Sequence, residues 1–187
     1  MAKKHTDSAI GVLEMVASVV ESLHEEMTDW QSNLEGNSME HLPKYEQVSE
    51  CVDALDNAEV RNPVDELETL LGSRAARESS DDLVPIDLDT VMVTYEMSTA
   101  KRQSRADRLG EAQDWMERAL SALEERLAVL KEQDAERVKA AEAVAAEDEE
   151  VEEVEEDERL DEIESLLADL RQALDSLADV QFPGMYG

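Results

Sequence analysis

The feature that most constrains this chain is a long run, from Glu111 to Phe182, that contains neither glycine nor proline. These two residues are the strongest breakers of helices, so a run of this length without them predicts long helices. Within it, ten of the twelve residues 147–158 (EDEEVEEVEEDE) are acidic. A block of like charge cannot be buried, so we expect this tract to face water or a basic partner.

The charge of the whole chain narrows the classes of function. Its 48 acidic and 17 basic residues give a formal net charge of −31. Binding to phosphates needs an excess of lysine and arginine, so direct nucleic-acid binding is not expected, and neither is binding to an anionic membrane surface. The 187 residues are 42% hydrophobic but only 3% aromatic. This composition suits one or two small domains built on aliphatic helix seams.

Apolar residues in the first third of the chain recur at helical spacing. Steps of three and four residues alternate along Leu13, Val16, Val20, Leu23, Met27, Trp30 and Leu34. This seam predicts a helix from Thr6 or Asp7 to about Leu34. A second helix is expected after Pro43, and a third from Asn62-Pro63 to Gly72. We therefore expect residues 6–72 to form a three-helix unit.

The middle of the chain predicts a connection between two halves. Residues 73–103 read as a linker, with one short segment at 91–97 (VMVTYEM) in which apolar and polar residues alternate. Alternation favours an extended conformation, although Leu88, Val91 and Tyr95 also share a helical face. No other segment shows strand character, so a strand here is expected to lack a partner.

The C-terminal half predicts two packed helices. Ser104 and Asp107 form a capping-box-like pair at the start of the first helix. Two leucine-rich seams follow, one over 109–130 and one over 160–177. An antiparallel hairpin over residues 104–181, turning near 144–147, would place Leu130 opposite Leu160, whereas a single continuous helix would span about 117 Å. The expected class is all-α: an N-terminal small helical bundle plus a C-terminal antiparallel helical hairpin, or coiled coil, with an acidic bend.

Catalytic and metal-binding patterns are weak. Cys51, the single cysteine, lies beside the apolar Val52 and is expected to be a small buried hydrophobe. Glu21 and His24 have the Glu-x-x-His spacing of di-metal bundles, which require a second copy and further carboxylates. No P-loop, dinucleotide fingerprint or nucleophile elbow is present. We expect no enzyme and no cofactor or metal, and a reducing, cytoplasmic setting.

Three segments are candidate partner-binding sites. The tail 182–187 gathers apolar residues around a Pro-Gly turn, and it is expected either to fold back on the hairpin or to dock on another protein. A basic cluster opens the fourth helix and is expected to pair with acidic helices of this chain or of a second copy. The acidic tract completes the set. The candidate residues are Phe182, Met185 and Tyr186; Lys101, Arg102, Arg105 and Arg108; and Glu149, Glu150, Glu152 and Glu153.

These observations lead to one expected function and one alternative. The chain is expected to be a non-enzymatic interaction protein, an assembly, scaffolding or adaptor factor, that contacts a protein partner through helix seams, acidic tract or tail. Short seams are individually marginal, so a homo-oligomer is also expected. The alternative is a DNA-mimic inhibitor of a nucleic-acid-binding enzyme. In general character the chain resembles small proteins of phages and mobile elements, a resemblance that assigns no site residue.

Overall fold

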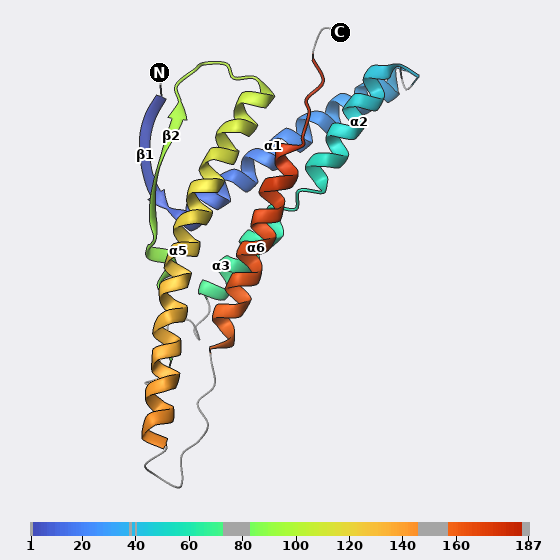
Figure 1. Cartoon of the computed structure of the whole chain (residues 1–187). Coiled ribbons are helices and arrows are strands. Elements are labelled where there is room, and N and C mark those ends of the chain that lie inside the picture. The colour runs from blue at the N-terminus through green and yellow to red at the C-terminus, as the bar shows by residue number, and fades with distance from the viewer. Residues whose placement is uncertain (1, 38, 40, 73–82, 146–156, 185–187) are drawn as a thin grey trace.

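The computed structural model describes residues 2–37, 39, 41–72, 83–145 and 157–184. Within these ranges the protein is mostly helical, with one two-stranded antiparallel sheet (Figure 1). The all-α expectation therefore holds for most of the molecule but omits the sheet.

The sheet joins β1 (Ala2–Ser8) to β2 (Met92–Ser98), in register from Ala2 opposite Ser98 to Ser8 opposite Met92. The structure corrects two expectations here. The first helix does not begin at Thr6 or Asp7, and the extended segment near 91–97 does have a strand partner. β1 was missed because its sequence, AKKHTDS, has no apolar alternation and few residues of high strand propensity.

The first helix, α1 (Ala9–Gly36), begins where Ser8 caps it. The Ser8 Oγ accepts a hydrogen bond from the Gly11 backbone N–H at 3.1 Å, which satisfies one of the free donors of the first turn. The expected seam on α1 is buried from Leu13 through Met27. α1 packs mainly against α5 (Arg105–Ala145), whose own seam, from Leu109 to Leu130, is buried as expected.

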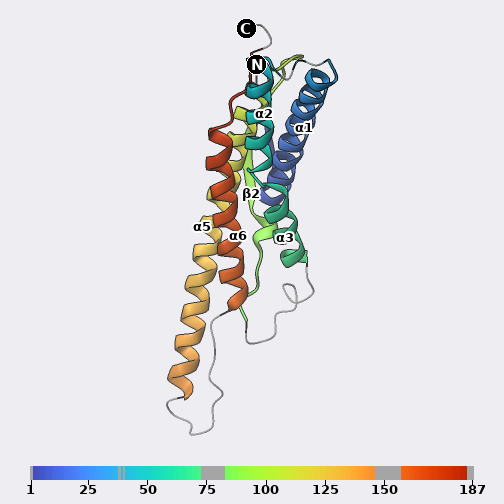
Figure 2. The ribbon, with the colours of Figure 1, turned by 90° about the vertical axis from the view of Figure 1, so that its right-hand side faces the viewer.

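The last helix, α6 (Glu158–Ala178), lies antiparallel to α5 (Figures 1 and 2). Arg171 of α6 bonds Glu124 of α5 at 2.7 Å, and Lys131 of α5 bonds Asp161 of α6 at 2.7 Å. Later residues of α6 thus lie beside earlier residues of α5. The chain between them, residues 146–156, lies outside the described residues.

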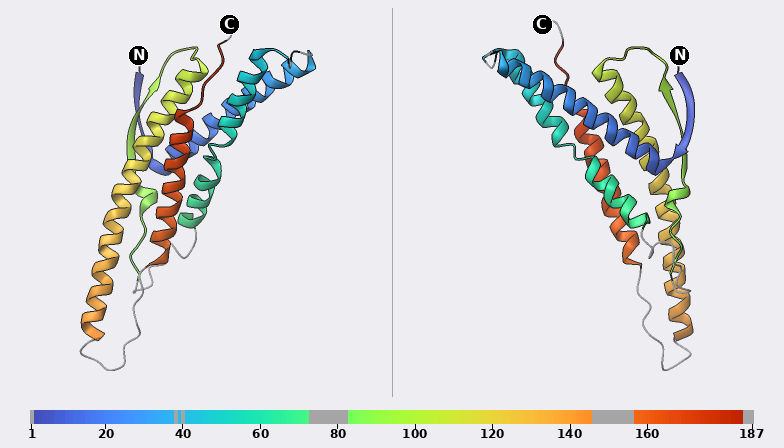
Figure 3. Two further views of the ribbon diagram at one scale, coloured as in Figure 1. Left: turned by 45° about the vertical axis from the view of Figure 1, so that its right-hand side comes forward. Right: turned by 180° about the vertical axis from the view of Figure 1, so that it is seen from behind.

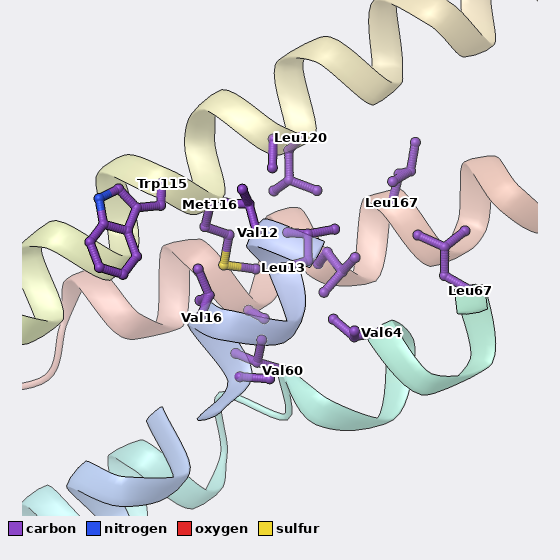
Figure 4. Packing of buried hydrophobic residues seen from close by; sticks show 14 of the residues in the cluster. Val12, Leu13, Val16, Val60, Val64, Leu67, Trp115, Met116, Leu120 and Leu167 are labelled. Atoms are coloured by element: carbon purple, nitrogen blue, oxygen red, sulfur yellow. The ribbon is translucent and has the colours of Figure 1, made fainter. Parts of the chain in front are cut away.

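Two shorter helices, α2 (Pro43–Asp56) and α3 (Arg61–Gly72), complete the bundle. Figure 2 shows α6 between α5 and the α2–α3 pair. Val12 and Leu13 of α1 meet Val64 of α3 and Leu120 of α5 in the shared interior (Figure 4).

The expected linker does not separate two cores. The 3₁₀ turn η1 (Leu88–Thr90) and β2 supply Leu88, Val93 and Tyr95 to the same buried cluster that contains α1, α3, α5 and α6. The described residues of 6–72 and 104–181 therefore share one hydrophobic core.

Candidate functional site

A pocket of about 460 Å³ lies between α1, the start of α5 and the chain after α6. It brings together three residues that the sequence singled out separately: Arg105 and Arg108 from the basic cluster and Phe182 from the tail. We call it the tail pocket, and its lining consists of Glu26, Gln103, Ser104, Arg105, Ala106, Arg108, Phe182, Pro183 and Gly184.

The first turn of α5 is held by the capping pair expected from the sequence. The Asp107 Oδ2 accepts from the Ser104 hydroxyl at 2.7 Å and from its backbone N–H at 3.2 Å, and the Ser104 Oγ accepts from the Asp107 N–H at 3.0 Å. The hydroxyl bond and then the backbone bond lower the pKa of Asp107. The helix that begins at this turn places Arg105 and Arg108, which are three residues apart in the sequence, on one face of α5.

Both arginines bind the same carboxylate. The Arg105 Nε donates to the Glu26 Oε2 at 3.0 Å, and the Arg108 Nη2 donates to the Glu26 Oε1 at 2.6 Å. Partial burial opposes ionisation of Glu26, but the hydrogen bonds from Arg108 and Arg105 outweigh it and lower its pKa. Two guanidinium groups share one carboxylate, so this triad carries a formal charge of +1 in a chain of −31.

An aromatic ring and a second cation adjoin the triad. The Arg105 guanidinium lies 5.4 Å from the Trp30 ring centroid, and the Lys44 Nζ lies 5.8 Å from it. Both distances are within the range of cation–π attraction. The same Lys44 Nζ donates to the Gly184 carbonyl, which ties α2 to the tail. Phe182 is half-buried against the core.

The other candidate residues are not brought to this pocket. Lys101 and Arg102 are exposed and make no ion pair with any described residue. Met185 and Tyr186 lie outside the described residues, and so do all four candidate glutamates of the acidic tract, Glu149, Glu150, Glu152 and Glu153.

A second arginine–carboxylate cluster lies where α6 begins beside α5; we call it the distal cluster. Asp157 caps α6, accepting from the Arg159 N–H at 3.1 Å, and its own N–H donates to the Asp134 Oδ2 at 2.9 Å. Arg137 donates to the Asp134 Oδ1 at 2.8 Å, and Arg159 to the Asp157 Oδ1 at 2.8 Å. Burial opposes the charge of Asp157, but the bonds from Arg159 lower its pKa.

Residues noted for chemistry have structural surroundings. Cys51 is 2% exposed, and burial raises its pKa to about 11. Both oxygens of Glu21 accept hydrogen bonds from Arg61, at 2.7 Å each. Among the described residues, no group of histidine, cysteine, aspartate and glutamate is arranged to hold a metal ion.

Sequence reasoning missed Glu26 in the lining of the tail pocket, and it missed Trp30 and Lys44 as neighbours of its arginines and its tail. Trp30 was expected on the apolar seam, and the structure packs it, half-buried, against the core with two cations near its ring. The available signal was the basic cluster, which predicted an acidic helix as its partner without saying which one. Glu26 is one of many glutamates, and only the crossing of α1 and α5 selects it.

Comparisons with known proteins give no family for this chain. No family model, no curated protein and no solved structure matches it. Within the described residues, no helix combines the length and the apolar character that crossing a membrane requires.

Proposed function

We propose that the protein is a non-enzymatic interaction protein that binds a protein partner at the tail pocket. One observation carries this proposal: the pocket unites Arg105, Arg108 and Phe182 from opposite ends of the C-terminal half. Apolar contact surface beside donors of hydrogen bonds is typical of protein recognition sites, in which arginine and aromatic residues are enriched.

The charges of the pocket suggest what the partner presents there. The triad of Arg105, Arg108 and Glu26 has one uncompensated positive charge. A carboxylate or carbonyl of the partner would complete it, while an apolar side chain packs on Phe182. The surrounding surplus of acidic residues would attract a partner that is basic overall, so long-range attraction and local contact select different features.

Affinity capture from the cells that make the protein tests this proposal. We expect Phe182→Ala, Arg108→Ala and deletion of 182–187 each to lower the recovery of the partner, with unchanged far-ultraviolet circular dichroism. Val129→Ala is the matched control, because Val129 is 41% exposed on α5 and does not line the pocket. Equal recovery by all variants would refute binding at this site.

The alternative function, DNA mimicry, has one observation in its favour. Five described basic residues each pair with a carboxylate of this same chain, namely Arg61, Arg105, Arg126, Lys131 and Arg171. Exposed acidic residues of α6 make no such pair, and they are Glu158, Glu162, Asp169 and Asp175. A DNA mimic would compete with duplex DNA for a basic enzyme, and the competition would weaken steeply with salt. Salt-insensitive binding that depends on Phe182 would favour the tail pocket.

We also propose that α5 and α6 are the two arms of an antiparallel hairpin that turns near residues 144–147 and has an acidic bend. The antiparallel contacts of Arg171 and Lys131 support it. Spin labels at the exposed Glu132 and Glu162 test it by electron paramagnetic resonance. A hairpin places the two helix axes about 10 Å apart at this level, whereas one continuous helix would separate the labels by about 45 Å.

A further inference from the structure

The two edges of the β1–β2 sheet differ in whether another element covers them. Along the outer edge of β2, the Glu96 carbonyl accepts from the Trp115 Nε1 at 2.8 Å, and the Ser98 N–H donates to the Glu111 Oε1 at 3.1 Å. α5 therefore satisfies that edge. β1 lies on the far side of β2 from α5, and no described element lies along its outer edge (Figures 1 and 3).

The hydrogen-bond pattern identifies which groups of β1 face outward. The Ala9 N–H donates to the Val91 carbonyl at 2.7 Å, and these residues continue the register of the sheet. In an antiparallel ladder, residues that exchange hydrogen bonds alternate with residues that do not. Odd residues of β1 therefore turn their backbone groups towards β2, and even residues turn theirs to the open edge. The outward carbonyl of Glu96 and N–H of Ser98 agree with this alternation.

The open edge is complementary to itself. If a second copy aligns antiparallel with His5 facing His5 of the second copy, Lys4 lies opposite Thr6 and Lys3 lies opposite Asp7. Both Lys4 and Thr6 have outward backbone groups, so the new ladder uses only free donors and acceptors. Lysine on an edge strand usually discourages pairing, but in this alignment each Lys3 meets an opposite charge.

We propose that two copies of this chain associate through β1 into a four-stranded antiparallel sheet, in the order β2–β1–β1–β2, with His5 at the two-fold axis. Three observations carry this proposal: the edge is uncovered, its hydrogen-bonding parity is correct for self-pairing, and Lys3 lies opposite Asp7 of the second copy. Strand addition of this kind is a common mode of association, and a two-fold interface uses the same residues twice. The inference is independent of the tail pocket, whose lining includes no residue of β1.

Sedimentation velocity across micromolar concentrations tests the association. Thr6→Pro removes an outward N–H without touching the β1–β2 ladder, and we expect it to weaken the dimer roughly tenfold or more, because symmetry removes the donor twice. Thr6→Val is the matched control: it keeps the N–H and loses only the hydroxyl, which lies 3.1 Å from the hydroxyl of Thr94. A wild-type protein that stays monomeric at about 100 µM, well above the Kd of a micromolar complex, would overturn the proposal, as would equal dimerisation of the two variants.

Cysteine cross-linking tests the register. Residues that face each other without exchanging hydrogen bonds have Cα atoms about 4.5 Å apart, within reach of a disulfide. We expect mild oxidation to cross-link His5→Cys to itself, and Thr6→Cys to remain uncross-linked because Thr6 lies opposite Lys4. The native Cys51 is 2% exposed, so wild type serves as the blank. Cross-linking of Thr6→Cys but not of His5→Cys would refute this register.

Discussion

The tail pocket and the distal cluster both join arginines to carboxylates, at opposite ends of α5, but they differ in balance. At the start of α5, Arg105 and Arg108 share the single carboxylate of Glu26, whose side chain is 38% exposed. Near its other end, Asp134 and Asp157 are held by two arginines, and their side chains are only 5% and 3% exposed.

The two clusters therefore differ in how completely their charged groups are paired. In the distal cluster each buried carboxylate accepts a hydrogen bond from an arginine, and the backbone N–H of Asp157 is bonded as well, so both carboxylates and this N–H have partners. Such a group fixes the approach of α6 to α5. In the tail pocket one positive charge is left over beside an apolar surface, which is an arrangement suited to a further ligand.

The largest expected effect is at the distal cluster. Asp134→Ala removes the acceptor of a buried N–H and the partner of a guanidinium, so we expect a loss of about 3 kcal/mol or more in the free energy of unfolding. Urea denaturation measures it. Asp161→Ala is the control, because its ion pair with Lys131 is exposed and should contribute under about 1 kcal/mol. Equal losses would show that the buried distal cluster contributes no more to stability than an exposed ion pair does.

Sequence patterns predicted the helix seams and the cap of α5 but missed the distal cluster. The seams of α1, α5 and α6 follow from apolar spacing alone, because a buried helix face repeats along the chain. Ser104 and Asp107 were recognised as a cap for the same reason: both partners are local. Asp134 was not recognised, because its partner Asp157 is remote and belongs to the acidic tract 147–158, which was expected to face water; the structure instead buries Asp157 at 6% exposure.

β1 is a second element that could not be predicted from the sequence alone. The alternation at 91–97 indicated a strand, but its partner is a polar segment that owes its conformation to pairing with β2 rather than to its own residues. The tail pocket was predicted in pieces. Arg105, Arg108 and Phe182 were separate candidates in the sequence. That they line one pocket depends on how α1 crosses α5 and on where α6 ends.

The cap of α5 gives the next largest expected effect. Ser104→Ala removes the hydroxyl that bonds Asp107, and loss of an N-cap costs about 1 kcal/mol of stability. Because the same turn sets the spacing of Arg105 and Arg108, we also expect weaker partner capture. Ser22→Ala is the control: Ser22 is an exposed serine inside α1, and no hydrogen bond joins its hydroxyl to another described residue. Unchanged stability in the Ser104 variant would show that the cap does not hold this end of α5.

A smaller loss is expected in the tail pocket itself. Glu26→Gln keeps the shape of the side chain but removes its charge, so the two bonds from Arg105 and Arg108 weaken. These side chains are partly exposed, and the expected loss is about 1 kcal/mol or less. If the tail pocket can accept a further anionic ligand, the variant should also bind an acidic peptide more tightly than wild type, as measured by fluorescence anisotropy. A loss as large as that of Asp134→Ala would show that the tail pocket and the distal cluster contribute equally to stability.

The smallest expected effect concerns carboxylates that lack an arginine of their own. A hydrogen bond with Glu14, then burial and the negative charge of Glu14, raise the pKa of Glu68 from 4.5 to about 7. The folded protein therefore binds this proton more tightly than the unfolded chain does, and its stabilising effect is lost as the pH rises from 4.5 through 7.

Glu68→Gln should then be more stable than wild type at pH 8 by a few tenths of a kcal/mol, since Glu68 is exposed and screened. The difference should vanish near pH 4, where Glu68 of the wild type is itself neutral. Thermal unfolding at the two pH values measures it, with the exposed Glu66→Gln as the control for loss of one negative charge. The same gain in both variants would assign the effect to net charge, whereas a gain confined to Glu68 would assign it to the repulsion between Glu68 and Glu14.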